Sequence, residues 1–239
     1  MFELLKKVHR FFSGQLFYPI LLSSALAVTI YLSRIYLSHN WLIYRNLVWN
    51  LFLAWVPYGF SILAAGLYQF FPRQWWLLII PGGLWLLFFP NAAYIVTDFS
   101  HLGERPYVPL WYDILLLATF AWTGIFLAIT SLRTMQVLVK SYLGGFMSWI
   151  FVAIAMGLNG LGIYLGRFER WNSWDFFLHP RTILVDIARR FANPFDNLRF
   201  FGFTILITAF LIVCYLTFVS VHRLDEKRDR RPPDQRNRI

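Results

Sequence analysis

The 22 residues FFGFTILITAFLIVCYLTFVSV, from Phe200 to Val221, contain no charged side chain. An α-helix rises about 1.5 Å per residue, so this stretch would reach about 33 Å, which is enough to cross the hydrocarbon core of a bilayer. A helix that is apolar on every face has no side to turn towards water. The stretch therefore predicts a transmembrane helix.

The composition of the whole chain is also that of a membrane protein. Of its 239 residues, 58% are hydrophobic and 14% are charged, and the mean hydropathy is +0.53. A soluble domain carries about 25% charged residues, and a globule of this size could not bury so much apolar surface. The single cysteine, Cys214, excludes an intramolecular disulfide and a cysteine-based zinc site. The composition thus predicts an all-α polytopic membrane protein and excludes a soluble enzyme or a disordered chain.

Six segments are long and apolar enough to span the bilayer. They are residues 17–37, 46–71, 75–97, 111–132, 142–166 and 200–221. The third contains Pro81 and Pro90, and either proline can split a helix, so this span is a candidate discontinuous one. Between the fifth and sixth spans, residues 180–193 predict an amphipathic helix that lies on the membrane surface.

The basic residues in the loops predict the orientation. Thirteen Lys and Arg fall on the side of the chain termini, including Arg133 and Lys140 in the expected loop between the fourth and fifth spans, and nine fall on the other side. We therefore expect both termini to be cytoplasmic. The organisation is a basic N-terminus (1–16), a six-span membrane domain (17–221) and a disordered basic tail (222–239).

The net charge of +10 then mostly comes from the basic residues that set the orientation in the membrane. The tail is expected to be solvated or to attract anionic lipid. Nucleic acid is not expected as a partner, because no aromatic residue interleaves with the basic ones to stack on bases.

Polar residues gather where the third, fourth and fifth spans meet the face opposite the termini. Asn91, Tyr94 and Asp98 follow i, i+3, i+7 spacing, so a helix would present them on one stripe. Tyr112 and Asp113 begin the fourth span, and a run rich in arginine and tryptophan ends the fifth. The three runs are expected to converge, which predicts a site at this face.

These same runs resemble a family of bacterial integral membrane proteins, domain of unknown function 1361. The resemblance rests on LWLLFFPNAAY (84–94) with Thr97-Asp98, on LWYD (110–113), and on YLGR (164–167) with RWNSWD (170–175). Ala93 departs from the family pattern, which has proline there, so the break after Pro90 is expected to be milder. The resemblance covers about residues 45–220. It implies a multi-pass protein of the bacterial cytoplasmic membrane and supplies no established activity.

Asp98, Asp113 and His101 are the candidates for acid–base chemistry. The alternative for each aspartate is a helix cap or an ion pair with arginine. Asp98 and His101 could supply two metal ligands, but a lone Asp/His pair is more often an interfacial hydrogen bond, so no metal and no cofactor is expected.

Two interpretations fit the arginine and tryptophan residues at the end of the fifth span. Guanidinium groups bind phosphate and indoles anchor in the headgroup layer, so the cluster could hold an anionic headgroup. The alternative is an ion-pair network with Asp98, Asp113 and Asp175 that fixes the span ends. The candidate residues for substrate binding or ion pairing are Asn91, Tyr94, Tyr112, Arg167, Arg170, Trp171, Asn172, Trp174 and Asp175.

In the fifth span, Gly162 and Gly166 predict close helix packing, with Asn159 hydrogen-bonded across the interface. A substrate path lined by Asn159, Asn50 and Asn91 is the alternative. Arg34 lies near a span end and is expected to snorkel to the interface.

The leading functional hypothesis from the sequence is a non-catalytic structural or assembly subunit that associates with other membrane proteins or with a second copy. It rests on the lack of a nucleotide-binding loop and of a complete metal-ligand set. Two alternatives stay open: an outer-leaflet enzyme acting on a lipid or lipid-linked substrate through Asp98 or Asp113, and a small-solute transporter with a site at the broken third span.

Overall fold

The computed structural model describes residues 2–105 and 107–229, and within these ranges it is built of helices. Their bounds are α1 (Phe2–Gly14), α2 (Phe17–Ser38), α3 (Arg45–Phe70), η1 (Trp75–Leu78), α4 (Ile79–Tyr94), η2 (Ile95–His101), α5 (Leu110–Phe168), α6 (Asp175–Leu178), α7 (Pro180–Ala192), η3 (Phe195–Asn197) and α8 (Leu198–Asp229). Five helical runs are long and apolar enough to cross a membrane. The all-α polytopic membrane fold predicted from the sequence is confirmed.

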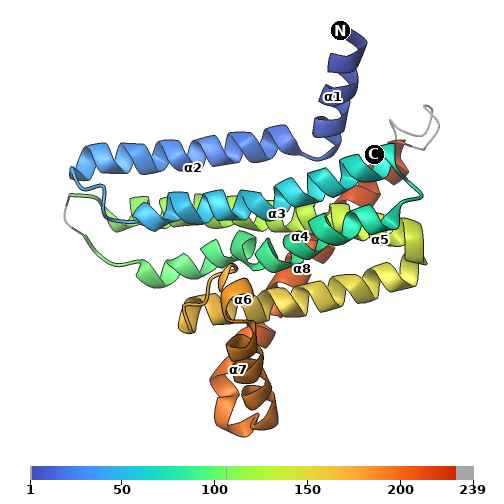
Figure 1. Cartoon of the computed structure of the whole chain (residues 1–239). Coiled ribbons are helices and arrows are strands. Elements are labelled where there is room, and N and C mark those ends of the chain that lie inside the picture. Colours follow the sequence, from blue (N-terminus) through green and yellow to red (C-terminus); the bar gives the residue numbers. More distant parts are fainter. Residues whose placement is uncertain (1, 106, 230–239) are drawn as a thin grey trace.

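The fourth of these runs, α5, provides two crossings. Its backbone is interrupted at Gly144, where φ is 85° and ψ is 175°. This conformation is essentially confined to glycine, because a Cβ would clash with the backbone. The chain reverses there, and the two halves of α5 run antiparallel (Figure 1). The expected loop over 133–141 is wrong: these residues continue the helix, since they include neither glycine nor proline.

The third span is helical along its whole length, from Trp75 to His101. Pro81 lies in the first turn of α4, where the backbone N–H groups have no intrahelical partner in any case. Pro90 lies deeper in α4, and its ring packs against Gly162, where a Cβ would come within 2.4 Å of it. After Tyr94 the α-helix tightens into the 3-10 helix η2. The discontinuity that the prolines suggested is therefore a change of helix type rather than a gap.

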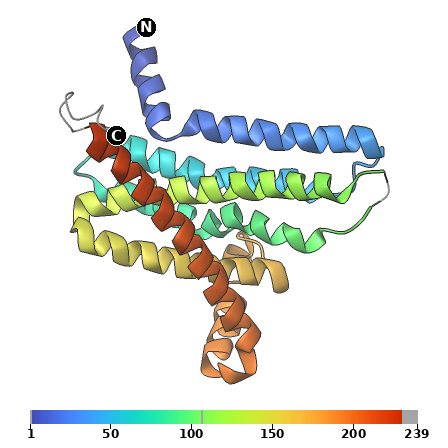
Figure 2. The ribbon, with the colours of Figure 1, turned by 180° about the vertical axis from the view of Figure 1, so that it is seen from behind.

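The first half of α5 forms the centre of the bundle. The helix packs against α2, α3, α4 and α8. The described N-terminus and the C-terminal end of α8 lie at the same end of the bundle, as both views show (Figures 1 and 2). α8 remains helical over 222–229, because its leucine, glutamate, lysine and arginine residues extend an existing helix easily. The remainder of the expected tail, 230–239, lies outside the described residues.

The amphipathic helix expected over 180–193 is α7, and it runs across the direction of the long helices (Figure 1). Its Ile183 is buried in a small cluster with Tyr164, Leu165 and Phe200. This cluster fixes α7 against the second half of α5 and the start of α8.

Arg190 adds a polar attachment for α7. Its Nη2 donates to Glu169 Oε1 at 2.7 Å, and its Nε donates to Asp186 Oδ2 at 3.2 Å. Burial alone would lower the pKa of Arg190, but the hydrogen bonds and charges of Asp186 and Glu169 outweigh burial and raise it. Arg190 therefore stays charged and links the end of α5 to α7.

Candidate functional site

The three polar runs singled out in the sequence lie at one end of the bundle, opposite the described termini (Figure 1). We call this the loop end, and it comprises residues 39–44, 95–105, 107–109 and 169–174. The run after Tyr94 is η2, the second run opens α5, and the third follows the last turn of α5. The loop end therefore brings together side chains that are far apart in the sequence.

Asp98 is the centre of a hydrogen-bond network at the loop end. Its side chain is 7% exposed. Arg167 Nη1 donates to its Oδ1 at 3.2 Å, and Asn50 Nδ2 donates to its Oδ2 at 2.8 Å. A buried carboxylate is costly unless it is paired and hydrogen-bonded, and here both oxygens have a donor. The network joins α3, η2 and α5.

Arg167 extends this network to the rest of η2. Its Nη2 donates to His101 Nε2 at 3.1 Å and also contacts Ser100 Oγ. Because arginine only donates, His101 Nε2 must be the acceptor, unprotonated at this nitrogen. Asp98 and His101 thus face a guanidinium rather than a shared metal position. Among the described residues, no three His, Cys, Asp or Glu side chains gather closely enough to hold a metal ion.

Asp113 forms a separate ion pair, with Arg34 of α2. Arg34 Nε and Nη2 donate to the two carboxylate oxygens at 2.6 and 3.0 Å, and both side chains are almost fully buried. The expectation that Arg34 snorkels to the interface is wrong. Its guanidinium turns into the bundle because a carboxylate lies there to receive it. Asp113 therefore lies apart from Asp98 and serves a different network.

Tyr44 contacts two arginines at the edge of the loop end through its ring. The guanidinium carbons of Arg34 and Arg105 lie 5.0 and 5.3 Å from its ring centroid. Burial raises the pKa of Tyr44, so its phenol stays neutral. The aromatic ring links the buried pair of α2 and α5 to the loop before α5.

An apolar groove of about 590 Å³ lies between α3, α4, the second half of α5 and α7. On α4 its lining runs from Gly83 to Tyr94, which is about 16 Å along the helix axis. This is about half of the roughly 30 Å hydrocarbon core. Ile183, Leu184 and Ile187 of α7 form the opposite wall. The groove is thus about one leaflet deep.

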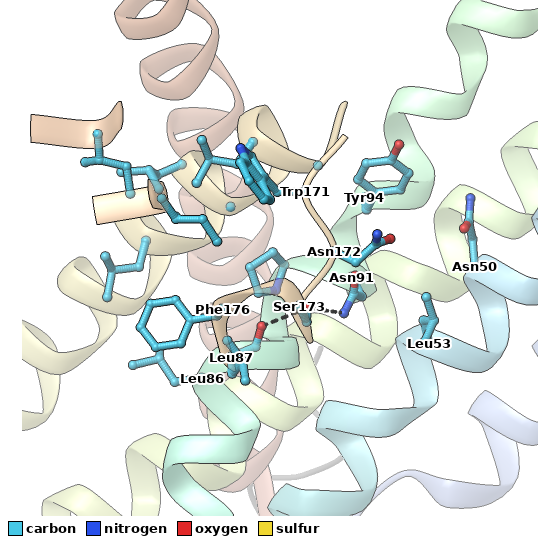
Figure 3. Close-up of a pocket in the computed structure, with 18 of the residues that line it drawn as sticks. Asn50, Leu53, Leu86, Leu87, Asn91, Tyr94, Trp171, Asn172, Ser173 and Phe176 are labelled. Atoms are coloured by element: carbon cyan, nitrogen blue, oxygen red, sulfur yellow. Dashed lines mark hydrogen bonds between the residues drawn. The ribbon is translucent and has the colours of Figure 1, made fainter. Parts of the chain in front are cut away.

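A polar contact holds the loop 169–174 over the groove. Asn91 Nδ2 donates to Ser173 Oγ at 3.0 Å, and Ser173 Oγ donates to the carbonyl of Leu87 at 3.1 Å. In Figure 3, Leu87 and Phe176 lie on one side of this contact and Asn50 on the other. Both partners of the contact line the groove.

A second cavity, of about 790 Å³, lies towards the loop end, and we call it the basic cleft. Four arginines line it, and Asp98 is the carboxylate among its described lining residues. The cleft also includes the first turn of α3. The arginines are Arg45, Arg105, Arg167 and Arg170.

The two cavities share part of their walls. Five residues line both, from α3, α4, α5 and the loop after it. These are Trp49, Asn50, Tyr94, Gly166 and Asn172. A ligand that reaches past them would have an apolar part in the groove and an anionic part in the basic cleft.

The family model for a protein of unknown function, DUF1361, matches residues 49–214. The match covers more than half of the chain. This chain belongs to the DUF1361 family. The comparisons with curated proteins and with solved structures gave no match. In this DUF1361 protein the matched region holds the apolar groove and Asp98, whereas α2 with Arg34 and the start of α3 precede it.

Other residues singled out in the sequence lie away from the two cavities. Tyr112 donates to the carbonyl of Ile30, and Asp175 accepts from the backbone N–H of Asn172, so both hold local structure. Trp174 is half-exposed and lines neither cavity. In this DUF1361 protein these side chains support the site rather than line it.

The packing residues of the fifth span all face α4. Asn159 Nδ2 donates to the carbonyl of Phe89 at 3.4 Å, Gly162 meets Pro90, and Gly166 meets Tyr94. This spacing lets α4 and α5 approach closely. Asn159 lies at this helix contact and lines neither cavity, in contrast to Asn50 and Asn91.

Sequence reasoning missed two arginines of the basic cleft, Arg45 and Arg105. Both lie in or next to loops that carry little pattern of their own. The available signal was the position of Arg45, directly before a long apolar segment and hence at a helix N-terminus. Ser100 was missed as a partner of Arg167.

Proposed function

We propose that this protein binds a lipid or lipid-linked molecule with an anionic headgroup, with its chain in the apolar groove and its headgroup in the basic cleft. The observation that carries the proposal is the shared wall of two adjoining cavities with opposite polarity. An amphiphile has this same division into an apolar and a charged part. Pockets for such ligands are mostly apolar, with a few placed polar groups that fix orientation.

The depth of the groove supports a ligand from a single leaflet. A lipid chain that starts at Tyr94 and ends near Gly83 would span about half of the hydrocarbon core. Asp98 then acts as a positioning residue, because it pairs with Arg167 in the basic cleft, and Asn50 holds Asp98 in turn.

This proposal favours the lipid-directed alternative over the assembly subunit. The assembly subunit was the leading hypothesis from the sequence alone. An assembly subunit needs only an outer surface, whereas the described residues form two adjoining cavities with a shared wall. A transporter would need a path beyond the groove, and Asn159, one of the residues expected to line it, is packed against α4.

We further propose that the loop end faces outwards and that both termini are cytoplasmic, as the thirteen to nine distribution of basic residues favours. In a Cys214→Ser background, Glu104→Cys at the loop end is expected to react with a membrane-impermeant maleimide in intact bacterial cells that express the protein. Ser13→Cys, at the opposite end, is expected to react only after lysis. Labelling of Ser13→Cys alone in intact cells would reverse the orientation.

Filling the groove is expected to weaken lipid binding. Gly83 lines the groove, and a Cβ added there meets no atom within 4 Å, so Gly83→Leu would place its side chain in the space for a lipid chain. We expect binding of dioleoyl phosphatidic acid to weaken at least about tenfold, or 1.4 kcal/mol. Native mass spectrometry of the full chain in detergent, titrated with this lipid, measures the change.

Gly59→Leu is the matched control. Gly59 is also an exposed helical glycine with open space around its Cβ position, but it lies outside the groove. Both substitutions improve helix propensity by a similar amount, so both variants are expected to fold. Unchanged lipid binding by Gly83→Leu would overturn the proposed function.

A further inference from the structure

We propose that the basic cleft selects a lipid whose headgroup ends in a phosphate monoester or a diphosphate over a lipid with a singly charged phosphodiester. This inference rests on the proposed function, because it assumes that the groove and the cleft hold one ligand. It assigns the selection to three arginines, Arg45, Arg105 and Arg170.

The charge of the cleft is the first support. Four arginines and one aspartate line it within the described chain, a surplus of three positive charges. A single phosphodiester would neutralise only one of them. A phosphate monoester carries a charge of about −1.5 to −2 at pH 7 and offers three strong acceptor oxygens.

The second support concerns which of the four arginines have N–H groups available to a ligand. Arg167 is committed to Asp98, Ser100 and His101. Within the described part of the chain, Arg45 and Arg170 make no ion pair. Arg105 donates from Nη2 to the carbonyl of His101 at 3.3 Å, and its buried Nε has no hydrogen-bond partner. A guanidinium with free N–H groups binds phosphate oxygens in a bidentate manner.

The backbone of Arg170 is the third support. Its φ is 59°, in the left-handed region, directly after the end of α5. Glycine is the usual residue in this position after a helix, because it has no Cβ to clash. An arginine kept in this conformation beside a cavity points to a role for its side chain.

The start of α3 adds to the same cleft. Tyr44 and Arg45 precede and begin a 26-residue helix that has no side-chain cap and no acidic residue in its first turn. The positive end of a helix dipole favours anions, and phosphate in particular. In this cleft the dipole of α3 adds to the three arginines and does not replace them.

The test compares lipids that share the same chains. The full-length protein in detergent is titrated with dioleoyl phosphatidic acid, dioleoyl phosphatidylglycerol and dioleoyl phosphatidylcholine, and native mass spectrometry reports each dissociation constant. We expect phosphatidic acid to bind roughly tenfold more tightly than phosphatidylglycerol, and phosphatidylcholine to bind most weakly. Arg170→Gly removes one charge and suits the left-handed backbone, so it is expected to fold and to lose most of this preference.

Arg181→Gln is the control for charge removal, because Arg181 is exposed on α7 and lines neither cavity. It is expected to keep the preference for phosphatidic acid. Equal binding of phosphatidic acid and phosphatidylglycerol, with both still weakened by Gly83→Leu, would overturn the selectivity and leave the proposed function standing. If Gly83→Leu leaves lipid binding unchanged, the proposed function fails as well. Inorganic pyrophosphate that binds as tightly as phosphatidic acid would assign the cleft to a soluble phosphate compound and overturn the lipid headgroup.

Discussion

Asp113→Leu is expected to lower the free energy of unfolding by about 3–5 kcal/mol, because it leaves the guanidinium of Arg34 buried without its counter-ion. Arg34 is fully buried, and both carboxylate oxygens of Asp113 accept from it. Leucine has the same branched shape as aspartate and is larger, so the substitution leaves no cavity. Reversible unfolding by steric trapping in bicelles measures the difference.

The double variant Arg34→Met with Asp113→Leu separates charge from packing. Replacing both partners of a buried ion pair by apolar residues of similar volume is often neutral or stabilising, so we expect most of the lost stability to return. Glu3→Gln removes an exposed partner of Lys6 and is expected to change little, since surface pairs contribute little. A double variant no more stable than Asp113→Leu would contradict this account.

Gly162→Ala is expected to destabilise the protein by about 2–3 kcal/mol through overpacking. A Cβ at Gly162 would lie 2.4 Å from Cγ and 2.8 Å from Cβ of Pro90. The proline ring is rigid and lies inside α4, so it cannot rotate away as a flexible side chain would. The same steric-trapping measurement checks the prediction.

Gly157→Ala is the matched control for Gly162→Ala. Gly157 lies in the same helix, and a Cβ there meets no atom within 4 Å. Alanine favours a helix over glycine by about 1 kcal/mol, so this variant is expected to be as stable as the parent or slightly more stable. A similar loss from both substitutions would show that the contact with Pro90 is not the cause.

The membrane-spanning segments could be predicted from the sequence, because a long apolar stretch can be recognised from consecutive residues alone. The charged residues at 133 and 140 suggested a loop, yet the helix continues to Gly144, because residues 133–141 include neither glycine nor proline. Arginine and lysine are good helix formers and do not end a helix by themselves. The sharp reversal at Gly144 was not predicted, because a glycine in a membrane helix is as often a packing residue.

The candidate site was predicted in part. Helical spacing predicted that Asn91, Tyr94 and Asp98 share one stripe. The structure instead places Asp98 in the 3-10 helix η2, with Asn91 in the groove, Asp98 in the basic cleft and Tyr94 lining both. The pairing of Asp113 with Arg34 could not be predicted, because these residues are 79 positions apart and lie on helices whose relative rotation is set by packing. Arg45 and Arg105 reach the basic cleft from loops whose course has no periodic pattern.

The reversal at Gly144 also couples the two halves of α5 mechanically. The first half is held at the loop end by Asp113, and the second half returns to the same end with Arg167. Because a single residue joins them, neither half has slack to slide along its axis without moving the other. The height of Arg167 in the basic cleft is therefore set by a turn at the far end of the molecule. A lengthened turn there would shift Arg167 without changing any residue that lines the cleft.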